Sequence, residues 1–400
     1  MGILNGYLVL DFGRYIAAPF CCQLLADMGA EVIRVERPGG EADRQRGPWT
    51  EDGTSIYFAT INRNKKSITL DVRHLEGAKL LANLVAKADV LVHNLPVSRA
   101  MGLGLDYASV RRHNEKIVHL GISGFGASGG RADDPALDAI IQAMSGALSM
   151  NGSAGVAPSQ ADEPTPNHIP YVDFSTGLFG ALATVSALLH RKNTGEGQSI
   201  DLSLYKTALS FVAAYGVLAE SHLGGNRGQM GDDLVYGIGG VFKTTDGRVA
   251  INCLTDPMWR SLCDAIGRQD LLKEASLKND AERYKNRLPV KQAIAAWASS
   301  RSTQDAVSHL AAAGVPVGPV QTVEQVLEDS QAEALEAFQS IQQPGIGEIP
   351  VGSFVPKFGT IPTPIRRPAP GVGQHNREIY GEVLGLNPRQ IEDLTKTRVI

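Results

Sequence analysis

Short apolar runs rich in β-branched residues alternate with amphipathic segments along the first half of the chain. The periodicity predicts a strand at residues 6–12, a helix at residues 17–28 and a second strand at residues 31–36, which together form a βαβ unit. The same alternation then predicts strands at residues 66–71, 89–93 and 116–123, and helices at residues 75–88, 107–113, 136–148 and 175–190. Strands that alternate with helices indicate an α/β fold, with a Rossmann-like, mostly parallel sheet covered by helices. Ligands of such folds bind beyond the carboxyl ends of the strands.

The pattern changes after a glycine-rich stretch at about residues 224–240. A hairpin with its turn at Asp246-Gly247 follows, and helices are predicted at residues 258–266, 288–300, 303–313 and, after a proline-rich stretch, 377–384. We therefore divide the chain into a large α/β domain at residues 1–200, a linker at residues 201–224, a small α+β domain at residues 225–330 and a C-terminal segment at residues 331–400.

The composition is ordinary for a protein with a substantial core, because 43% of the 400 residues are hydrophobic and the formal net charge is −4. A weakly acidic balance gives no electrostatic reason to expect a nucleic acid or an anionic membrane as a partner. The cysteines lack metal-ligand spacing, and neither a signal peptide nor an apolar run of about 18–20 residues is recognisable. We therefore expect a cytoplasmic protein that binds no metal ion.

Asp173 stands where a proline-containing loop enters a long helix of small residues. The free N–H groups and the dipole at the start of a helix favour a carboxylate at such a place. Two roles fit this position: a catalytic nucleophile, or an N-cap that only stabilises the helix. His168, in the preceding loop, either orients Asp173 or is a loop residue with an ordinary hydrogen bond.

Two further features admit more than one interpretation. The sequence GFGASG at residues 124–129 matches the GxGxxG pattern of dinucleotide-binding loops. No helix opens directly after it, and it follows the fifth predicted strand rather than the first, so we favour a plain loop over a nicotinamide or flavin site. Arg37 follows a strand and precedes a glycine-containing turn, a place suited either to phosphate binding or to an ordinary surface charge.

Several segments resemble the class III CoA-transferases, the family of formyl-CoA transferase and carnitine CoA-transferase that is also called CaiB/BaiF. The helix after Asp173 ends in RKNTGEGQ, residues 191–198, which is similar to the family's R-x-x-TG-x-GQ ending. The run LDFGRYIAAPFCCQLLADMGAEVIRVERPGG, residues 10–40, is similar to the family's N-terminus. NRNKKSITLD, residues 62–71, resembles its N-x-x-K-(R/K)-S-I-x-L-D segment, and the resemblance extends to residues 368–386.

The resemblance implies roles for individual residues. Asp173 would carry the acyl group, and Gly239 and Gly240, in a glycine-rich loop of the small domain, would stabilise the oxyanion. Coenzyme A, as a substrate and not as a permanently bound cofactor, would contact Tyr15, Ile16, Ala17, Arg37, Leu70, Arg73, Asn94, Leu95 and Arg99. The family fold also implies a homodimer whose two chains interlock, with the chain crossing to the small domain and returning to the large one.

Three positions depart from patterns in this superfamily. The arginine usual in the loop after Asn94 is absent at residues 102–104, which leaves Arg99 as the nearest arginine. Ile16 stands where the formyl-CoA branch has a glutamine, which argues against oxalate or formate as substrate. Leu137 and Asp138 replace the histidine–aspartate pair of the related α-methylacyl-CoA racemases, so one of the two acid/base groups that a racemase needs is missing.

We therefore predict a CoA-transferase that moves coenzyme A from an acyl-CoA to a free carboxylic acid. Asp173, expected to be ionised at neutral pH, would form a mixed anhydride with the acyl group and then an aspartyl-CoA thioester. Segments at residues 255–259 and 344–347 are similar to branches of the family that act on small dicarboxylates such as succinate. A racemase of the same superfamily is the nearer alternative, and a nucleotide-binding dehydrogenase or an inactive CoA-binding protein is the more distant one.

Overall fold

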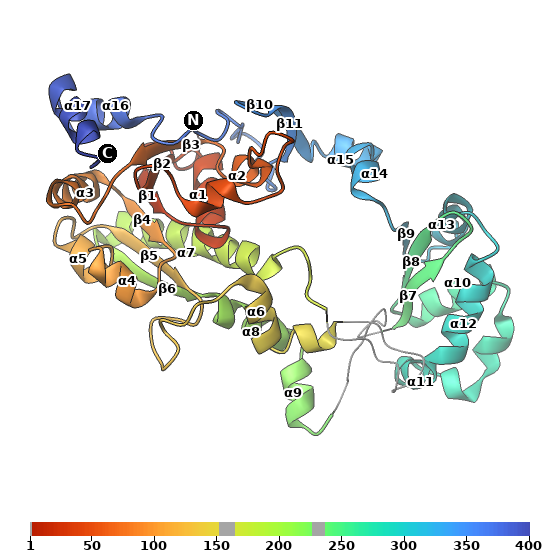
Figure 1. The fold of residues 1–400 in the computed structure, drawn as a ribbon. Coiled ribbons are helices and arrows are strands. Elements are labelled where there is room, and N and C mark those ends of the chain that lie inside the picture. Colours follow the sequence, from red (N-terminus) through yellow and green to blue (C-terminus); the bar gives the residue numbers. More distant parts are fainter. Residues whose placement is uncertain (1, 152–164, 226–236) are drawn as a thin grey trace. The chain divides into compact units, whose positions relative to one another are not determined.

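The computed structural model describes residues 2–151, 165–225 and 237–400 of the chain (Figure 1). These residues cluster into two compact units. Unit 1 comprises the residues up to Gly146 together with Asn167–Ala219 and Glu333–Ile400, and unit 2 comprises the described parts of Ala147–Pro166 and Glu220–Ala332. The N-terminal and C-terminal parts of the chain therefore belong to the same unit.

Unit 1 is built on a six-stranded sheet with the strand order β3-β2-β1-β4-β5-β6, in which every neighbouring pair is parallel. The strands are β1 (Leu8–Phe12), β2 (Glu31–Glu36), β3 (Lys65–Thr69), β4 (Val90–His93), β5 (Val118–Ser123) and β6 (Gln198–Ser203). This confirms the predicted α/β class with a parallel sheet. The strand order reverses between β1 and β4, and at such a switch point the loops after the two strands diverge and leave a crevice for a ligand.

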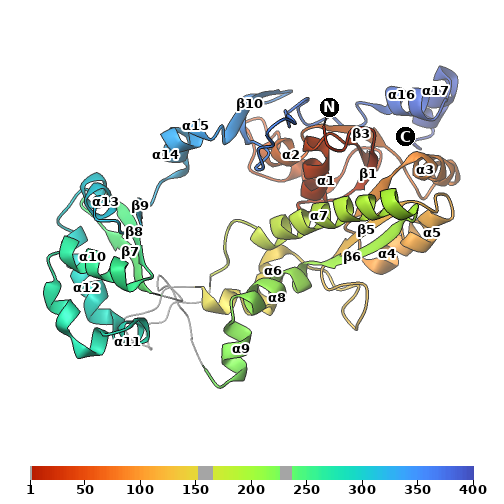
Figure 2. The same cartoon turned by 180° about the vertical axis from the view of Figure 1, so that it is seen from behind.

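Helices cover both faces of this sheet, because consecutive side chains of a strand point to opposite faces and both sets are apolar here. Val9 belongs to one hydrophobic core and its neighbour Leu10 to the other. The helices that pack on the first core are α1 (Ala17–Asp27), α6 (Asp138–Met144), α7 (Tyr171–Thr194) and α8 (Leu204–Ala214). Those on the second are α3 (Leu75–Lys87), α4 (Val97–Gly102) and α5 (Tyr107–Arg111). Figure 2 shows α7 running across the sheet in front of β5.

Helix α7 packs closely against α1 through small residues. A Cβ atom placed on Gly177 would lie 2.7 Å from the carbonyl oxygen of Ala17, so only glycine permits this approach. Among the described residues α7 is also the one helix whose length and apolar composition would allow it to cross a membrane, which corrects the expectation that no segment has that character. Its apolar character reflects the glycine, alanine and leucine residues of its buried face, which contribute to the core on the first face of the sheet.

Further short helices lie along the chain outside the sheet of unit 1. The 3-10 helix η1 (Ala42–Gln45) and α2 (Ile56–Ile61) lie between β2 and β3 along the chain, and η2 (Leu148–Met150) follows α6. Helices α8 and α9 (Val217–His222) occupy most of residues 201–224, which were expected to form a linker.

The C-terminal segment packs beside β3. It contains β10 (Phe338–Gln343), β11 (Gly347–Gly352), α16 (Asn376–Glu378), the π-helical η6 (Ile379–Val383) and α17 (Pro388–Lys396). The buried Tyr380 hydroxyl donates a 2.7 Å hydrogen bond to the carbonyl oxygen of Thr69 at the end of β3. The predicted final helix at residues 377–384 is thus a short α-helical turn followed by a π-helical stretch, while α17 and the β10–β11 hairpin were not predicted.

Unit 2 contains an antiparallel sheet in the order β7-β8-β9, covered by helices. The strands are β7 (Ile238–Lys243), β8 (Arg248–Cys253) and β9 (Val317–Pro319). Its helices are α10 (Asp256–Ala265), η4 (Gln269–Lys273), η5 (Ala275–Leu277), α11 (Asp280–Lys285), α12 (Arg287–Ala298), α13 (Thr303–Ala312) and α14 (Val323–Leu327), and α15 (Ser330–Ala334) leads back to unit 1. The predicted hairpin and its turn at Asp246-Gly247 are confirmed, since β7 and β8 pair on either side of that turn.

Candidate active site

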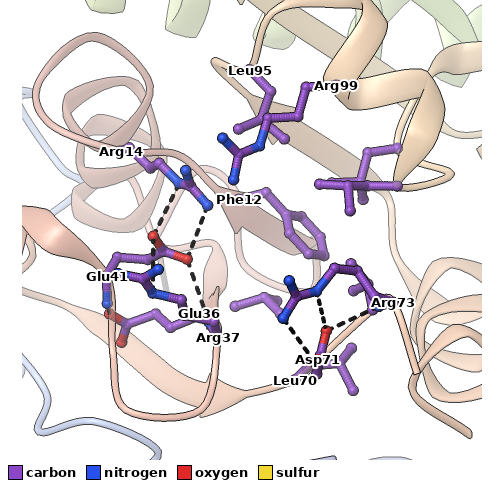
Figure 3. A pocket seen from close by; sticks show the side chains of 14 residues that line it. Phe12, Arg14, Glu36, Arg37, Glu41, Leu70, Asp71, Arg73, Leu95 and Arg99 are labelled. Atoms are coloured by element: carbon purple, nitrogen blue, oxygen red, sulfur yellow. Dashed lines mark hydrogen bonds and ion pairs between the residues drawn. The ribbon is translucent and has the colours of Figure 1, made fainter.

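Two adjoining cavities open at the carboxyl ends of the strands in unit 1, around the switch point between β1 and β4. The aspartate cavity, of about 240 Å³, is lined by the β1–α1 loop, the ends of β4 and β5, the loop before α6 and Asp173 of α7. The arginine cavity, of about 120 Å³, lies beside it and is lined by the ends of β1, β2 and β3 and the loops that follow them (Figure 3). Arg14, Leu95 and Arg99 belong to the walls of both, so the two cavities share one boundary.

Asp173 lies in the first turn of α7. The N-cap of this helix is Pro170, which provides no side-chain hydrogen bond. The backbone N–H of Asp173 instead donates a 2.9 Å hydrogen bond to the carboxylate of Asp138, at the start of α6. The interpretation of Asp173 as an N-cap is therefore wrong, because Asp138 satisfies that end of the helix and leaves the Asp173 carboxylate at the wall of the aspartate cavity.

Asp138 is fixed by a chain of hydrogen bonds. Its second carboxylate oxygen accepts a hydrogen bond from the fully buried Gln142, one turn further along α6. Gln142 in turn accepts a 2.9 Å hydrogen bond from the backbone N–H of Asn167 and donates to the carbonyl oxygen of the same residue. The loop that precedes α7 is thereby tied to α6, and the position of Asp173 depends on both elements.

Burial raises the pKa of Asp173 to about 7, and repulsion from the Asp138 carboxylate adds to the increase. This corrects the expectation that Asp173 is fully ionised at neutral pH. The carboxylate is removed from water and has a like charge beside it, and both conditions favour the protonated form. A carboxyl group whose pKa lies near neutrality is a feature that functional sites share.

Four arginines line the arginine cavity: Arg14, Arg37, Arg73 and Arg99. Figure 3 shows Arg14 paired with Glu41 and Arg73 paired with Asp71, at 3.1 Å and 2.9 Å respectively. The guanidinium of Arg99 points toward the cavity and makes no contact with the other side chains drawn. Several exposed guanidinium groups around one hollow suit the binding of phosphate groups, since each presents a fork of donors.

The loop between β1 and α1 separates the two cavities. Asn94, just after β4, accepts a 2.8 Å hydrogen bond from the N–H of Arg14 and donates a 2.7 Å hydrogen bond to the carbonyl oxygen of the same residue. This reciprocal pair joins the two chain segments that follow β1 and β4. Ile16 is the N-cap residue of α1, and Ala17 begins that helix.

The structure gathers most of the predicted site residues. The aspartate cavity is lined by Asp173, Tyr15, Ile16, Ala17 and Asn94. The arginine cavity is lined by Arg37, Leu70 and Arg73, and both cavities share Leu95 and Arg99. His168 is exposed and is not part of either wall. The loop at residues 124–129 contributes Gly124 to the aspartate cavity, and turns rather than a helix follow it.

Gly239 and Gly240 belong to unit 2, where both are buried in β7. This strand pairs with β8 on one side only, and consecutive N–H groups of a strand point to opposite sides. In regular pairing one of the two glycine N–H groups faces away from β8 and is open to another acceptor. Their role as oxyanion donors stays a prediction.

Sequence reasoning did not identify Arg14 as part of the site, nor Asp138 as a partner of Asp173. Arg14 comes two residues after the end of β1, so its place at the carboxyl end of a central strand was a usable signal. Asp138 had none, because its contact with Asp173 joins residues that are far apart along the chain.

The chain matches the family described as CoA-transferase family III over residues 4–376. It is 32% identical to the succinyl-CoA–L-malate CoA-transferase beta subunit of Chloroflexus aurantiacus, over 99% of this chain and 98% of that protein. It is 31% identical to the succinyl-CoA:mesaconate CoA-transferase of Haloarcula hispanica, over 98% of this chain and 99% of that protein. The crystal structure of a CaiB/BaiF family protein from Brucella suis superposes with a TM-score of 0.81 at 30% identity, covering 96% of this chain and 99% of that one.

A Rossmann-like unit with a carboxylate and a group of arginines at its switch point is suited to an enzyme that binds a phosphate-bearing substrate. The chain belongs to CoA-transferase family III, and it is a CoA-transferase whose substrate is coenzyme A in thioester form. This confirms the predicted family and enzyme class. The racemase alternative is not favoured: Leu137 lines the aspartate cavity, and no histidine does so among the described residues.

Proposed function

We propose that this enzyme transfers coenzyme A from succinyl-CoA to a small dicarboxylic acid of the malate or mesaconate type, with Asp173 as the nucleophile. The observation that carries the proposal is the position of Asp173 at the wall of a cavity that adjoins a group of arginines. Two relatives that are similar over nearly their whole length have names that pair succinyl-CoA with malate or mesaconate.

The chemistry proceeds through two covalent intermediates. The Asp173 carboxylate attacks the thioester carbonyl carbon, the carbon–sulfur bond breaks, and an aspartyl–succinyl anhydride and the CoA thiolate form. The thiolate attacks the aspartyl carbonyl of the anhydride, releases succinate and leaves an aspartyl-CoA thioester. The acceptor carboxylate displaces the thiolate to form a second anhydride, and the thiolate then attacks the acceptor's acyl carbon and restores Asp173. Each step exchanges one acyl bond for another, which divides one difficult exchange into easier ones.

The two cavities bind different parts of the substrate. The arginine cavity takes the phosphate groups of coenzyme A, with Arg37, Arg73 and Arg99 as its cationic groups. The path between the arginine cavity and the aspartate cavity is lined by Tyr15, Ile16, Ala17, Leu70, Asn94 and Leu95. The aspartate cavity takes the thioester, and each tetrahedral intermediate receives hydrogen bonds from the backbone of Gly239 or Gly240.

We also propose how the chain assembles. The chain forms an interlocked homodimer in the cytoplasm, in which the large domain is completed by residues 331–400 after the chain has passed through the small domain. No permanently bound cofactor takes part in the steps above.

Steady-state assays of transfer from succinyl-CoA to a panel of acids test the function. Asp173→Ala and Asp173→Asn should each lower kcat by about a thousandfold or more, because each removes the carboxylate that forms the anhydride. Asp201→Asn is a matched control, since Asp201 is an exposed carboxylate in β6 of the same unit and lines neither cavity. Transfer that survives the loss of Asp173, or the absence of transfer to any dicarboxylate, would contradict the proposal.

A further inference from the structure

Tyr15, at the junction of the two cavities, adopts a backbone conformation that side chains disfavour. Its φ angle is +60°, in the left-handed region, although it is not a glycine. Such a conformation persists only where surrounding contacts hold it, and residues of this kind gather at functional sites. The neighbours of Tyr15 in the chain line the same cavity, so whatever holds Tyr15 also sets the shape of the substrate site.

Two side chains anchor successive N–H groups of this loop. The N–H of Arg14 donates to Asn94 at 2.8 Å, and the N–H of Tyr15 donates to the carboxylate of Asp43 at 3.2 Å. Asn94 comes from the end of β4, whereas Asp43 comes from η1, which follows β2. The loop is therefore held between two elements on opposite sides of β1.

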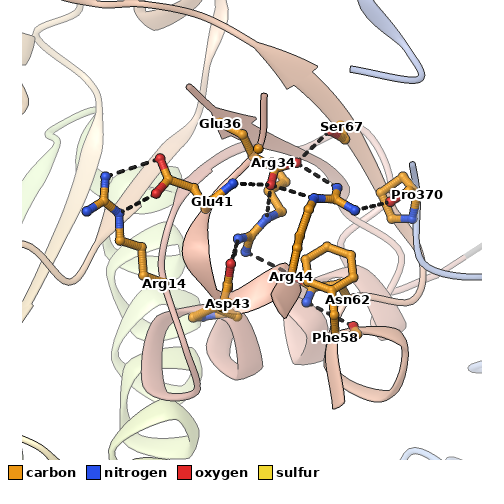
Figure 4. A network of polar contacts seen from close by, with 12 residues as sticks. Arg14, Arg34, Glu36, Glu41, Asp43, Arg44, Phe58, Asn62, Ser67 and Pro370 are labelled. Atoms are coloured by element: carbon orange, nitrogen blue, oxygen red, sulfur yellow. Dashed lines mark hydrogen bonds and ion pairs between the residues drawn. The ribbon is translucent and has the colours of Figure 1, made fainter. Parts of the chain in front are cut away.

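Asp43 is itself fixed by a buried arginine. Arg34 lies in β2 and is fully buried, and one nitrogen of its guanidinium lies 2.8 Å from both carboxylate oxygens of Asp43 (Figure 4). Asp43 is 1% exposed. A buried ion pair is weak evidence for stability, because desolvation offsets much of the attraction, so its presence calls for another explanation.

The same group of charges also holds the side chain of Arg14. Glu36 receives two hydrogen bonds from Arg44, at 2.8 Å and 2.7 Å, and accepts a further one from the N–H of Glu41. The carboxylate of Glu41 pairs with the guanidinium of Arg14, as Figure 4 shows. Arg34 joins the two parts of this network, because its Nε lies 3.4 Å from the Glu36 carboxylate. The network that holds the N–H of Tyr15 through Asp43 thus also holds the side chain of Arg14, a residue common to both cavities.

We propose that Asp43, supported by Arg34, is a positioning residue for coenzyme A, which holds the Arg14–Tyr15 turn together with Asn94. The inference rests on the proposed function, since it takes the two cavities to be the substrate site. Asp43 does not line either cavity, and it acts through the turn and not on the substrate. Loss of this support lets the backbone of Tyr15 relax toward an ordinary conformation, which displaces the residues that line the two cavities.

Four variants separate this role from general stability. Asp43→Asn removes the charge of the support, and Asn94→Ala removes the second anchor without touching the buried ion pair. The double variant combines both losses. Asp27→Asn is the matched control, because Asp27 pairs with Arg63 at 2.7 Å, both side chains are buried, and neither lines the aspartate cavity or the arginine cavity.

Each anchor variant should raise the KM for succinyl-CoA and the calorimetric Kd for free coenzyme A about tenfold, with kcat changed less than about threefold. The double variant should lose less affinity for coenzyme A than the product of the losses in the two single variants, because both anchors act on one turn. Asp27→Asn should lower the unfolding midpoint without changing the Kd.

Three results would overturn the inference or its basis. The positioning role would be excluded if Asp43→Asn bound coenzyme A as tightly as the wild type does. It would also be excluded if the change in Kd in the double variant equalled the product of the changes in the two single variants. Either of these outcomes leaves the proposed function intact, provided that the wild type transfers coenzyme A. A wild-type protein that binds no coenzyme A would instead contradict both proposals.

Discussion

At the scale of single residues, the pKa of Asp173 governs how the enzyme responds to pH. Burial and the Asp138 carboxylate raise it to about 7, and the nucleophile must be ionised to attack. Below the folded-state pKa the free enzyme is protonated, so kcat/KM should fall about tenfold per pH unit below about 7 and level off above it.

Asp138→Asn sharpens this prediction. The substitution keeps an oxygen that accepts the hydrogen bond from the Asp173 N–H but removes the like charge, so the inflection of the kcat/KM profile should move to lower pH. Burial remains, so the inflection should stay above the ordinary value for an aspartate. A profile that is flat between pH 5 and 8 in the wild type, or an inflection that Asp138→Asn leaves in place, would show that Asp173 does not titrate as the structure indicates.

At the scale of secondary structure, the contact between α1 and α7 fixes where Asp173 stands, since α7 carries Asp173 in its first turn. Gly177→Ala would bring a methyl group to 2.7 Å from the Ala17 carbonyl oxygen, which is backbone and cannot move aside cheaply. We expect a loss of about 1–3 kcal/mol in the free energy of unfolding, measured by urea denaturation. Gly102→Ala is the control, because a Cβ at that position meets nothing within 4 Å. Equal stability of the two variants would contradict this packing argument.

The elements that the sequence predicted well are those whose signal is local. Residues 31–36 contain three β-branched residues and end at a proline-glycine turn, and β2 has those bounds. Helix α3 likewise shows its amphipathic face in the sequence. The β10–β11 hairpin has only weak apolar alternation, which does not separate it from a loop. Helix α17 did have a local signal that the prediction missed, because Asn387 and Gln390 form a capping box and Pro388 stands at the start of the helix.

The residues of the candidate site likewise separate into those with a local sequence signal and those without one. The resemblance supplied Asp173 and the residues at the carboxyl ends of the strands, because those positions lie within short recognisable segments. The supports of the site were not predictable, since Asp138 and Asp43 each act on a residue that is distant along the chain. Asn94 was predicted as a residue of the site, but its contact with Arg14 was not. The raised pKa of Asp173 is likewise a property of burial, which the sequence does not display.

At the scale of the whole molecule, α7 and α8 present apolar side chains to solvent in unit 1. The exposed fractions are 59% for Leu178, 62% for Leu182 and 60% for Leu189 on α7, and 40% for Phe211 on α8. Exposed apolar groups gathered on one face often mark a protein interface. Since the family resemblance implies a homodimer, we expect this face to be covered by a second copy of the chain.

Light scattering at micromolar concentration tests that expectation. The wild type should have the mass of a dimer, and Leu182→Glu should lower the midpoint of thermal unfolding by placing a charge in the interface, because interlocked chains separate only when they unfold. Leu75→Glu is the control, since Leu75 is 71% exposed on α3, on the other face of the sheet. A monomeric wild type, or an unfolding midpoint that Leu182→Glu leaves unchanged, would exclude this face as the interface.

The central claim is that Asp173 carries the transferred group, and intact-protein mass spectrometry tests it most directly. The wild type, incubated with succinyl-CoA and no acceptor and then quenched in acid, should gain the mass of a covalently attached intermediate. Peptide mapping should place the added mass on Asp173, and Asp173→Asn should show none under the same conditions. An adduct on another residue, or continued transfer by a wild-type enzyme that never carries an adduct, would contradict the account.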